Sequence, residues 1–131
     1  MNIETLKKFG ADTDEGLARC FGMEDFYLKL VMTVPDEGNF NRLAEAIRAN
    51  DLDTAFECAH ALKGVLGNLS LTPIYDPVNE ITDQLRSRAQ ADYSAQLDEI
   101  LRQGSFCESS ARNNTGTEHP PRLGRVYKIN V

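Results

Sequence analysis

One short stretch of the chain, residues 53–71, carries the side chains best suited to chemistry. His60 is followed by Lys63 after three residues and by Gly64 after four, so the three lie on neighbouring turns of a helix. A neutral imidazole nitrogen is a nucleophile at neutral pH, and an ammonium group one turn away can stabilise nearby negative charge. The spacing therefore indicates a nucleophilic histidine with a cation beside it.

The same stretch has the apolar spacing of one helical face. Small and apolar residues recur at steps of four, three, four and three, at Ala55, Ala59, Leu62, Leu66 and Leu69. With about 100° of turn per residue, these five lie within about 60° of Leu62, whereas His60 lies near 160°. The stretch is predicted to be a helix that buries its apolar face and turns His60 outward.

Two glycines, Gly64 and Gly67, share the outward half of this predicted helix with His60. Each glycine costs about 1 kcal/mol relative to alanine in a helix interior, so two on a solvent face suggest that a close approach is kept open. A side chain at Gly64 is expected to crowd the imidazole. Gly67 has the same interpretation, with close helix packing as the alternative.

The run His60-Ala61-Leu62-Lys63-Gly64, followed by Gly67 and Asn68, resembles the motif of the histidine-containing phosphotransfer (HPt) domain. Members of this family are helical bundles of phosphorelay signalling, and the resemblance covers about residues 1–103. It implies that His60 is the phosphoryl acceptor, through Nε2, that Lys63 stabilises phosphoryl charge and that Gly64 gives clearance. The residues expected to dock a partner are Phe56, Glu57 and Gly67.

The resemblance also implies partners, namely response-regulator receiver domains and a hybrid sensor kinase. A phosphorylated receiver aspartate is expected to donate to His60, which then donates to another receiver. The chain has no nucleotide-binding loop, so a phosphocarrier is expected rather than an ATP-dependent enzyme. No cofactor is expected on this chain, and the magnesium of such transfers is expected in the receiver. Two alternatives are a module of the same fold that binds receiver or kinase domains without phosphotransfer, and a structural bundle with a chance motif.

Composition bounds the class of protein. The chain has 131 residues, 41% of them hydrophobic and 26% charged, as in one soluble domain with a core. It has neither an apolar run of about 18 residues nor a secretion signal, so a cytoplasmic protein is expected, and Met1 favours a free-standing one. Residues 1–104 hold 10 basic and 18 acidic side chains, which argues against a nucleic-acid surface. Transient docking and a monomer are expected.

The remaining candidate groups are interpreted as structural. The three cysteines, Cys20, Cys58 and Cys107, are odd in number and widely spaced, which fits neither a disulfide framework nor a zinc site. Asp12, Asp14 and Glu15 lack the pattern of a calcium loop and are better explained by helix capping. His119 precedes two prolines without metal-ligand companions and is interpreted as incidental.

The elements around this helix are also predicted to be helical. Their expected ranges are residues 2–9, 12–20, 24–34, 39–49, 73–90 and 92–103. Asp51 or Asp53 is expected to cap the central helix, Thr72 to cap the next, and Pro77 to delay or bend that helix. The predicted fold is an all-α antiparallel, four-helix-type bundle with short N-terminal helices. Residues 104–131 are predicted to be an irregular tail, with residues 125–131 as a strand candidate.

Overall fold

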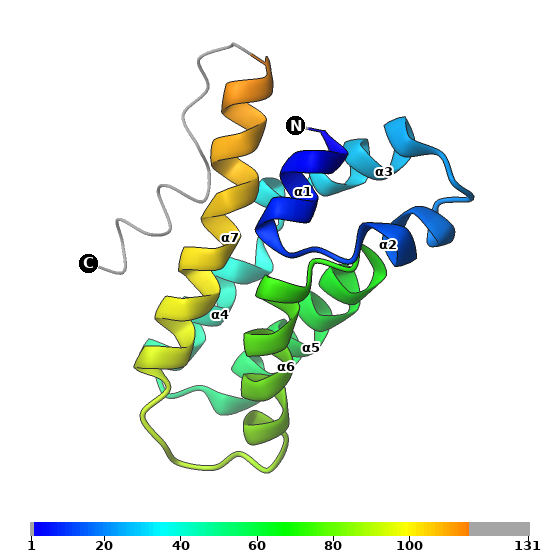
Figure 1. Cartoon of the computed structure of the whole chain (residues 1–131). Helices are drawn as coiled ribbons and strands as arrows, with labels where there is room; N and C mark the ends of the chain where they lie inside the picture. Colours follow the sequence, from blue (N-terminus) through cyan, green and yellow to red (C-terminus); the bar gives the residue numbers. More distant parts are fainter. Residues whose placement is uncertain (1, 116–131) are drawn as a thin grey trace.

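The computed structural model describes the backbone of residues 2–115 and the side chains of residues 2–106. Its helical elements, in chain order, are α1 (Ile3–Phe9), α2 (Thr13–Arg19), α3 (Glu24–Val31), the 3₁₀ turn η1 (Val34–Asp36), α4 (Asn39–Arg48), α5 (Leu52–Asn68), α6 (Thr72–Arg86) and α7 (Ser94–Thr115). No strand occurs within these residues. The predicted all-α bundle is confirmed, and α1–α3 gather at one end of it (Figure 1).

The long helices α4–α7 form the bundle, with α5 packed between α4 and α6 and with α7 against α6 and η1. Short turns join α4 to α5 and α5 to α6, so these neighbours run antiparallel. The largest fully buried side chains are Leu6, Tyr27, Phe40, Leu43, Leu62, Leu66, Leu71, Ile74, Ile81, Leu85 and Ile100. None of the helices in this part of the chain has both the length and the apolar character needed to cross a membrane.

Side-chain caps begin α2 and α5 at residues that the sequence predicts. The carboxylate of Asp12 accepts a hydrogen bond from the Glu15 backbone N–H at 3.1 Å, which starts α2. Asp51 accepts from the Thr54 N–H at 3.2 Å, so Asp51 rather than Asp53 caps α5. The Thr54 hydroxyl also donates to the Asp51 carboxylate at 2.7 Å, and this bond together with the backbone bond holds the pKa of Asp51 below its usual value.

Several helix boundaries differ from the prediction, among them the end of α6 at Arg86 instead of residue 90, and two of the differences involve proline. The predicted helix over residues 24–34 ends at Val31 and is followed by η1, which contains the buried Pro35. The helix α6 starts at Thr72 with Leu71 as the capping position, so Thr72 is not a side-chain cap. The helix continues through Pro77, and a delayed start is therefore wrong. Pro77 is one turn in, where its missing N–H removes a single hydrogen bond.

The last helix is longer than predicted. Residues 104–115, expected to begin an irregular tail, continue α7 to Thr115. Beyond the predicted end at Gln103, the Phe106 ring stacks on Phe9 of α1, with centroids 4.0 Å apart and planes at 6°. This contact buries aromatic surface beyond the amphipathic stripe and explains why the helix does not stop there. The strand candidate at residues 125–131 and His119 lie outside the described residues.

Candidate functional site

The helix α5 holds the candidate site on its solvent face. The predicted inner face is buried, since Ala55, Ala59, Leu62 and Leu66 have no exposed surface. Packing on both α4 and α6 fixes the rotation of α5 about its own axis. His60 is consequently exposed, and its predicted outward orientation is confirmed.

His60 opens into a groove of about 560 Å³ that runs along α5 toward its C-terminal end. The groove is formed by three helices, α2, α5 and α6. The lining residues are Glu15, Arg19, His60, Lys63, Gly64, Gly67, Asn68, Ser70, Thr72, Tyr75 and Asp76. The structure therefore brings the predicted His60, Lys63, Gly64 and Gly67 together around one space, which also contains groups from distant parts of the chain.

Lys63 lies one turn beyond His60 and is half-buried. Both residues line the groove, and none of the ion pairs among residues 2–106 involves Lys63. A flexible ammonium group in this place can donate to an anionic group carried by the imidazole. The geometry is compatible with the charge-stabilising role that the sequence suggests for Lys63.

The two glycines of the groove differ in what surrounds them. A Cβ atom placed at Gly64 meets nothing within 4 Å, so a methyl group there would not touch the imidazole. The position is open toward solvent. The expectation that Gly64 gives clearance stays a prediction, which concerns larger side chains and the incoming phosphoryl group. A Cβ at Gly67 comes within 3.1 Å of Cε1 of Tyr75, which supports the alternative of close packing between α5 and α6.

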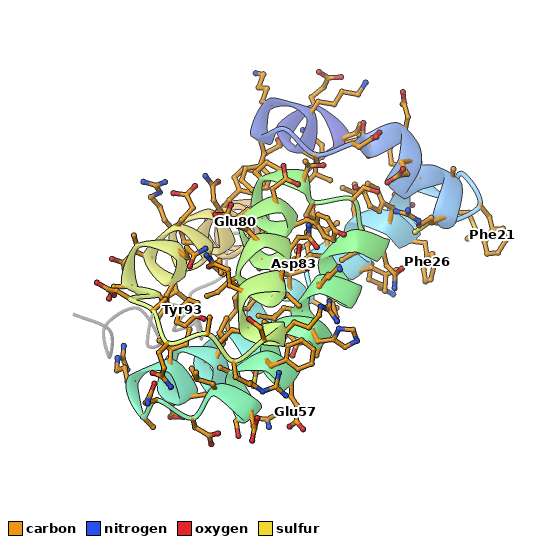
Figure 2. The ribbon with its side chains drawn as sticks, turned by 90° about the horizontal axis from the view of Figure 1, so that it is seen from below. Phe21, Phe26, Glu57, Glu80, Asp83 and Tyr93 are labelled. Carbon is orange, nitrogen blue, oxygen red and sulfur yellow. The ribbon has the colours of Figure 1, made fainter. Side chains whose placement is uncertain are left out.

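Phe56 and Glu57, expected to join the docking face, do not line this groove. Glu57 is exposed and projects from α5 far from the N-terminal helices (Figure 2). Phe56 is only half-exposed, and its ring stacks on the His60 imidazole with centroids 5.7 Å apart. Two guanidinium groups, of Arg86 and Arg88, also lie against this ring. The predicted docking face is therefore divided at His60. The groove lies toward the C-terminal end of α5, and Phe56 with its two guanidinium groups lies toward the N-terminal end.

Sequence reasoning missed the contacts that fasten α2 and α3 to the C-terminal end of α5. Arg19 donates to the Gly67 carbonyl at 2.7 Å and to Ser70 Oγ at 2.8 Å, and Ser70 Oγ donates to the Glu15 carboxylate at 2.8 Å. The hydroxyl of the buried Tyr27 donates to the Leu69 carbonyl at 2.7 Å. The Tyr27 hydroxyl caps the Leu69 carbonyl just past the end of α5. Arg19 adds a donor to the Gly67 carbonyl, which also accepts from the Ser70 backbone N–H at 3.1 Å. The two residues joined by each of these side-chain hydrogen bonds are more than 40 residues apart in the sequence. A local sequence pattern therefore cannot predict these contacts.

The two cysteines within the described side chains, Cys20 and Cys58, do not line the groove. Cys20 and Cys58 are buried free thiols, and burial raises the pKa of the Cys58 thiol. A raised pKa disfavours the reactive thiolate, in line with the interpretation of Cys58 as a small core residue. Within the described residues, no three His, Cys, Asp or Glu side chains gather closely enough to hold a metal ion.

An exposed histidine on the central helix of an antiparallel bundle, followed one turn later by a lysine and a glycine, is the arrangement of a histidine phosphocarrier. The family model described as the Hpt domain matches residues 36–105. The chain belongs to the Hpt domain family, whose members are phosphocarriers in two-component and phosphorelay signalling and interact there with receiver domains and kinases. The match includes α4, α5 and α6 and leaves α1–α3 outside.

The search of curated proteins and the search of solved structures gave no match to this chain.

Proposed function

We propose that this chain carries phosphoryl groups on His60, accepting them from the phosphorylated aspartate of one receiver domain and donating them to another. The observation that carries the proposal is the exposed imidazole of His60, which opens into a groove beside Lys63 and Gly64. The family match supports the type of reaction, and the groove beside His60 is the place that we propose for it.

The proposed reaction is a direct transfer between a carboxylate and an imidazole. The Nε2 lone pair of neutral His60 attacks the phosphorus of the aspartyl phosphate, and the bond from phosphorus to the aspartate oxygen breaks. The receiver regains its carboxylate, while the imidazole keeps its proton on Nδ1. Lys63 donates to the phosphoryl oxygens as the group arrives. Transfer to the second receiver is the same step in reverse.

The proposal divides the work between two proteins. This chain supplies the nucleophile and one cation, without ATP-dependent kinase activity or a cofactor of its own. The magnesium ion belongs to the acidic pocket of the receiver. The hybrid sensor kinase is the proposed upstream partner, and the carrier is proposed to be a cytoplasmic monomer that meets its partners transiently.

The proposed receiver-docking surface is the groove together with the neighbouring end of α2 and α3. Three large apolar side chains are exposed beyond Arg19: Phe21 at 87%, Met23 at 56% and Phe26 at 42%. Phe21 and Phe26 project from the N-terminal helices (Figure 2). Exposed aromatic and methionine side chains are enriched at protein interfaces, so this end offers apolar contact beside the open groove.

The test is phosphoryl transfer from a labelled phospho-receiver to the wild-type chain, with His60→Gln and His119→Gln beside it. The proposal predicts acid-labile, alkali-stable label on the wild type and on His119→Gln, and none on His60→Gln. His60→Gln is expected to keep the thermal stability of the wild type, since an exposed side chain contributes little. A folded wild type that receives no label from a panel of receivers would contradict phosphotransfer and favour a module that only binds.

A further inference from the structure

The ring of Phe56 is surrounded by three planar groups. The His60 imidazole lies with its centroid 5.7 Å from that of Phe56 and with an interplanar angle of 24°, within the range of offset stacking. The Arg88 and Arg86 Cζ atoms lie 4.6 Å and 5.4 Å from the ring centroid, close enough for cation–π attraction. Phe56 is therefore engaged within the molecule rather than left free for a partner.

Arg88 is itself fixed by several hydrogen bonds. Its Nε donates to a carboxylate oxygen of Asp53 at 2.6 Å, and Nη1 donates to the carbonyl groups of Leu85 at 2.9 Å and Arg86 at 3.1 Å. Asp53 lies near the start of α5, whereas Arg88 follows the end of α6. A planar guanidinium held at several atoms keeps its position over a ring better than a mobile ammonium group would.

The His60 imidazole has no comparable fixation of its own. No hydrogen bond or ion pair involving its ring occurs among the side chains of residues 2–106, and the residue is exposed. The stacked ring of Phe56 is thus the contact that limits rotation of the imidazole about its side-chain bonds. Limiting that rotation raises the fraction of time in which Nε2 points in a productive direction.

We infer that Phe56 is a positioning residue for His60, and that Arg88, anchored on Asp53, holds the Phe56 ring in place. The effect of Phe56 on the rate of transfer rests on the proposed phosphocarrier role. The positioning of the imidazole by Phe56 does not depend on that role. It assigns Phe56 a role in the rate of transfer, in place of the docking role that the sequence suggests. The contact between the imidazole and the Phe56 ring, together with the kinetics of transfer, separates these two roles.

The first test reads the imidazole directly. The chain has two histidines, so the ring C–H signals of His60 in a proton–carbon NMR spectrum are assigned with His119→Gln. Phe56→Ala is expected to shift these signals, because the ring current of the stacked phenyl group is removed. Phe56→Tyr is expected to retain the wild-type shifts, and Arg88→Gln to move them part of the way. Phe21→Ala, which removes an exposed phenylalanine elsewhere, is the matched control and is expected to leave them unchanged.

The second test is single-turnover transfer from a phospho-receiver over a range of receiver concentrations. Phe56→Ala is expected to slow transfer at saturating receiver roughly two- to tenfold, the size of an aromatic pair, without raising the half-saturating concentration. Phe56→Tyr is expected to restore the rate. Thermal unfolding identifies any variant that fails to fold. If Phe56→Ala does not fold, the transfer rates of Arg88→Gln and Phe56→Tyr at saturating receiver are compared instead.

Two results would overturn the inference. One is a folded Phe56→Ala variant with unchanged His60 signals, which would mean that the stack does not hold the imidazole. The other is an unchanged rate at saturation with a raised half-saturating concentration, which would return Phe56 to a docking role. A wild type that takes no phosphoryl group would instead refute the proposed function, while the NMR comparison would still decide whether Phe56 positions the imidazole.

Discussion

The two sides of His60 along α5 are built differently. Toward the start of the helix, Phe56 stacks on the imidazole and is covered by guanidinium groups from the end of α6. Toward the end of the helix, Gly64 has nothing within 4 Å of an added Cβ, and the groove begins there. The imidazole is thus in contact with an aromatic ring on one side and accessible on the other. A receiver is therefore expected to approach over the groove.

The two sides also depend on different parts of the chain. The supported side is made by α5 and the end of α6, both within the region that the family model matches. The open side is bounded by Glu15 and Arg19 of α2, which lies before that region. The N-terminal helices thus line the accessible side of the family motif, and their exposed apolar side chains belong to the proposed receiver-docking surface.

The largest predicted effect comes from blocking the open side. Gly64→Leu is expected to slow phosphoryl transfer roughly 100-fold, because a side chain there displaces the incoming phosphoryl group from the imidazole. Glu57→Leu adds the same side chain to α5 outside the groove and is expected to change the rate little. Single-turnover transfer from a labelled phospho-receiver measures both. Equal rates for Gly64→Leu and the wild type would mean that the receiver arrives from elsewhere.

Removing the cation of the open side is expected to have the next largest effect. Lys63→Ala is predicted to slow transfer about tenfold, corresponding to the loss of one charge-assisted hydrogen bond of about 1.5 kcal/mol. Lys63→Arg is expected to recover part of the rate, since it keeps the charge. The same single-turnover assay with both variants checks this. A Lys63→Ala variant as fast as the wild type would reduce Lys63 to a solvated helix residue.

The fastening of the N-terminal helices can be tested at Gly16. A Cβ at this position comes within 2.5 Å of the ring and hydroxyl of the buried Tyr27, whose hydroxyl bonds the end of α5. Gly16→Ala is therefore expected to lower the free energy of unfolding by about 1–3 kcal/mol, the usual cost of overpacking. Urea unfolding measures the change. An unaltered urea midpoint would show that the Tyr27 ring moves aside without cost. The hydrogen bond from Tyr27 to the end of α5 would then not hold this ring in a fixed position.

The smallest predicted effect sharpens the contrast between the two glycines. Gly64→Ala is expected to raise the free energy of unfolding by up to about 1 kcal/mol, because alanine favours a helix and meets no neighbour here. Gly67→Ala gains the same propensity but crowds Tyr75, so its net change is expected to be smaller. Urea unfolding of the pair gives the comparison. A greater gain at Gly67 than at Gly64 would contradict it.

Local pattern was sufficient to predict the part of the site that lies on one helix. The apolar steps through Leu62 and Leu66 determine which face of α5 is buried, and His60 follows on the opposite face by helical geometry alone. The Asp12 cap of α2 is likewise a local interaction between neighbouring residues. Such features need no knowledge of what packs against the helix.

The parts that the sequence did not reveal depend on tertiary contacts. Arg88 meets Phe56 only because α5 and α6 are antiparallel neighbours, and Arg19 meets Gly67 because α2 crosses the end of α5. The extension of α7 follows from Phe106 meeting Phe9 nearly a hundred residues earlier in the chain. Local propensity is a weak prior where such contacts decide.

Whether His60 receives the phosphoryl group on its open side can be decided by locating that group after transfer. The chain, labelled with ¹⁵N at its histidines, is phosphorylated by a phospho-receiver, and its imidazole nitrogen signals are recorded. We expect one phosphoryl group bonded to Nε2 of His60, with Nδ1 unmodified and with the signals of His119 unchanged. Phosphorylation of Nδ1, of His119 or of another residue would contradict this expectation.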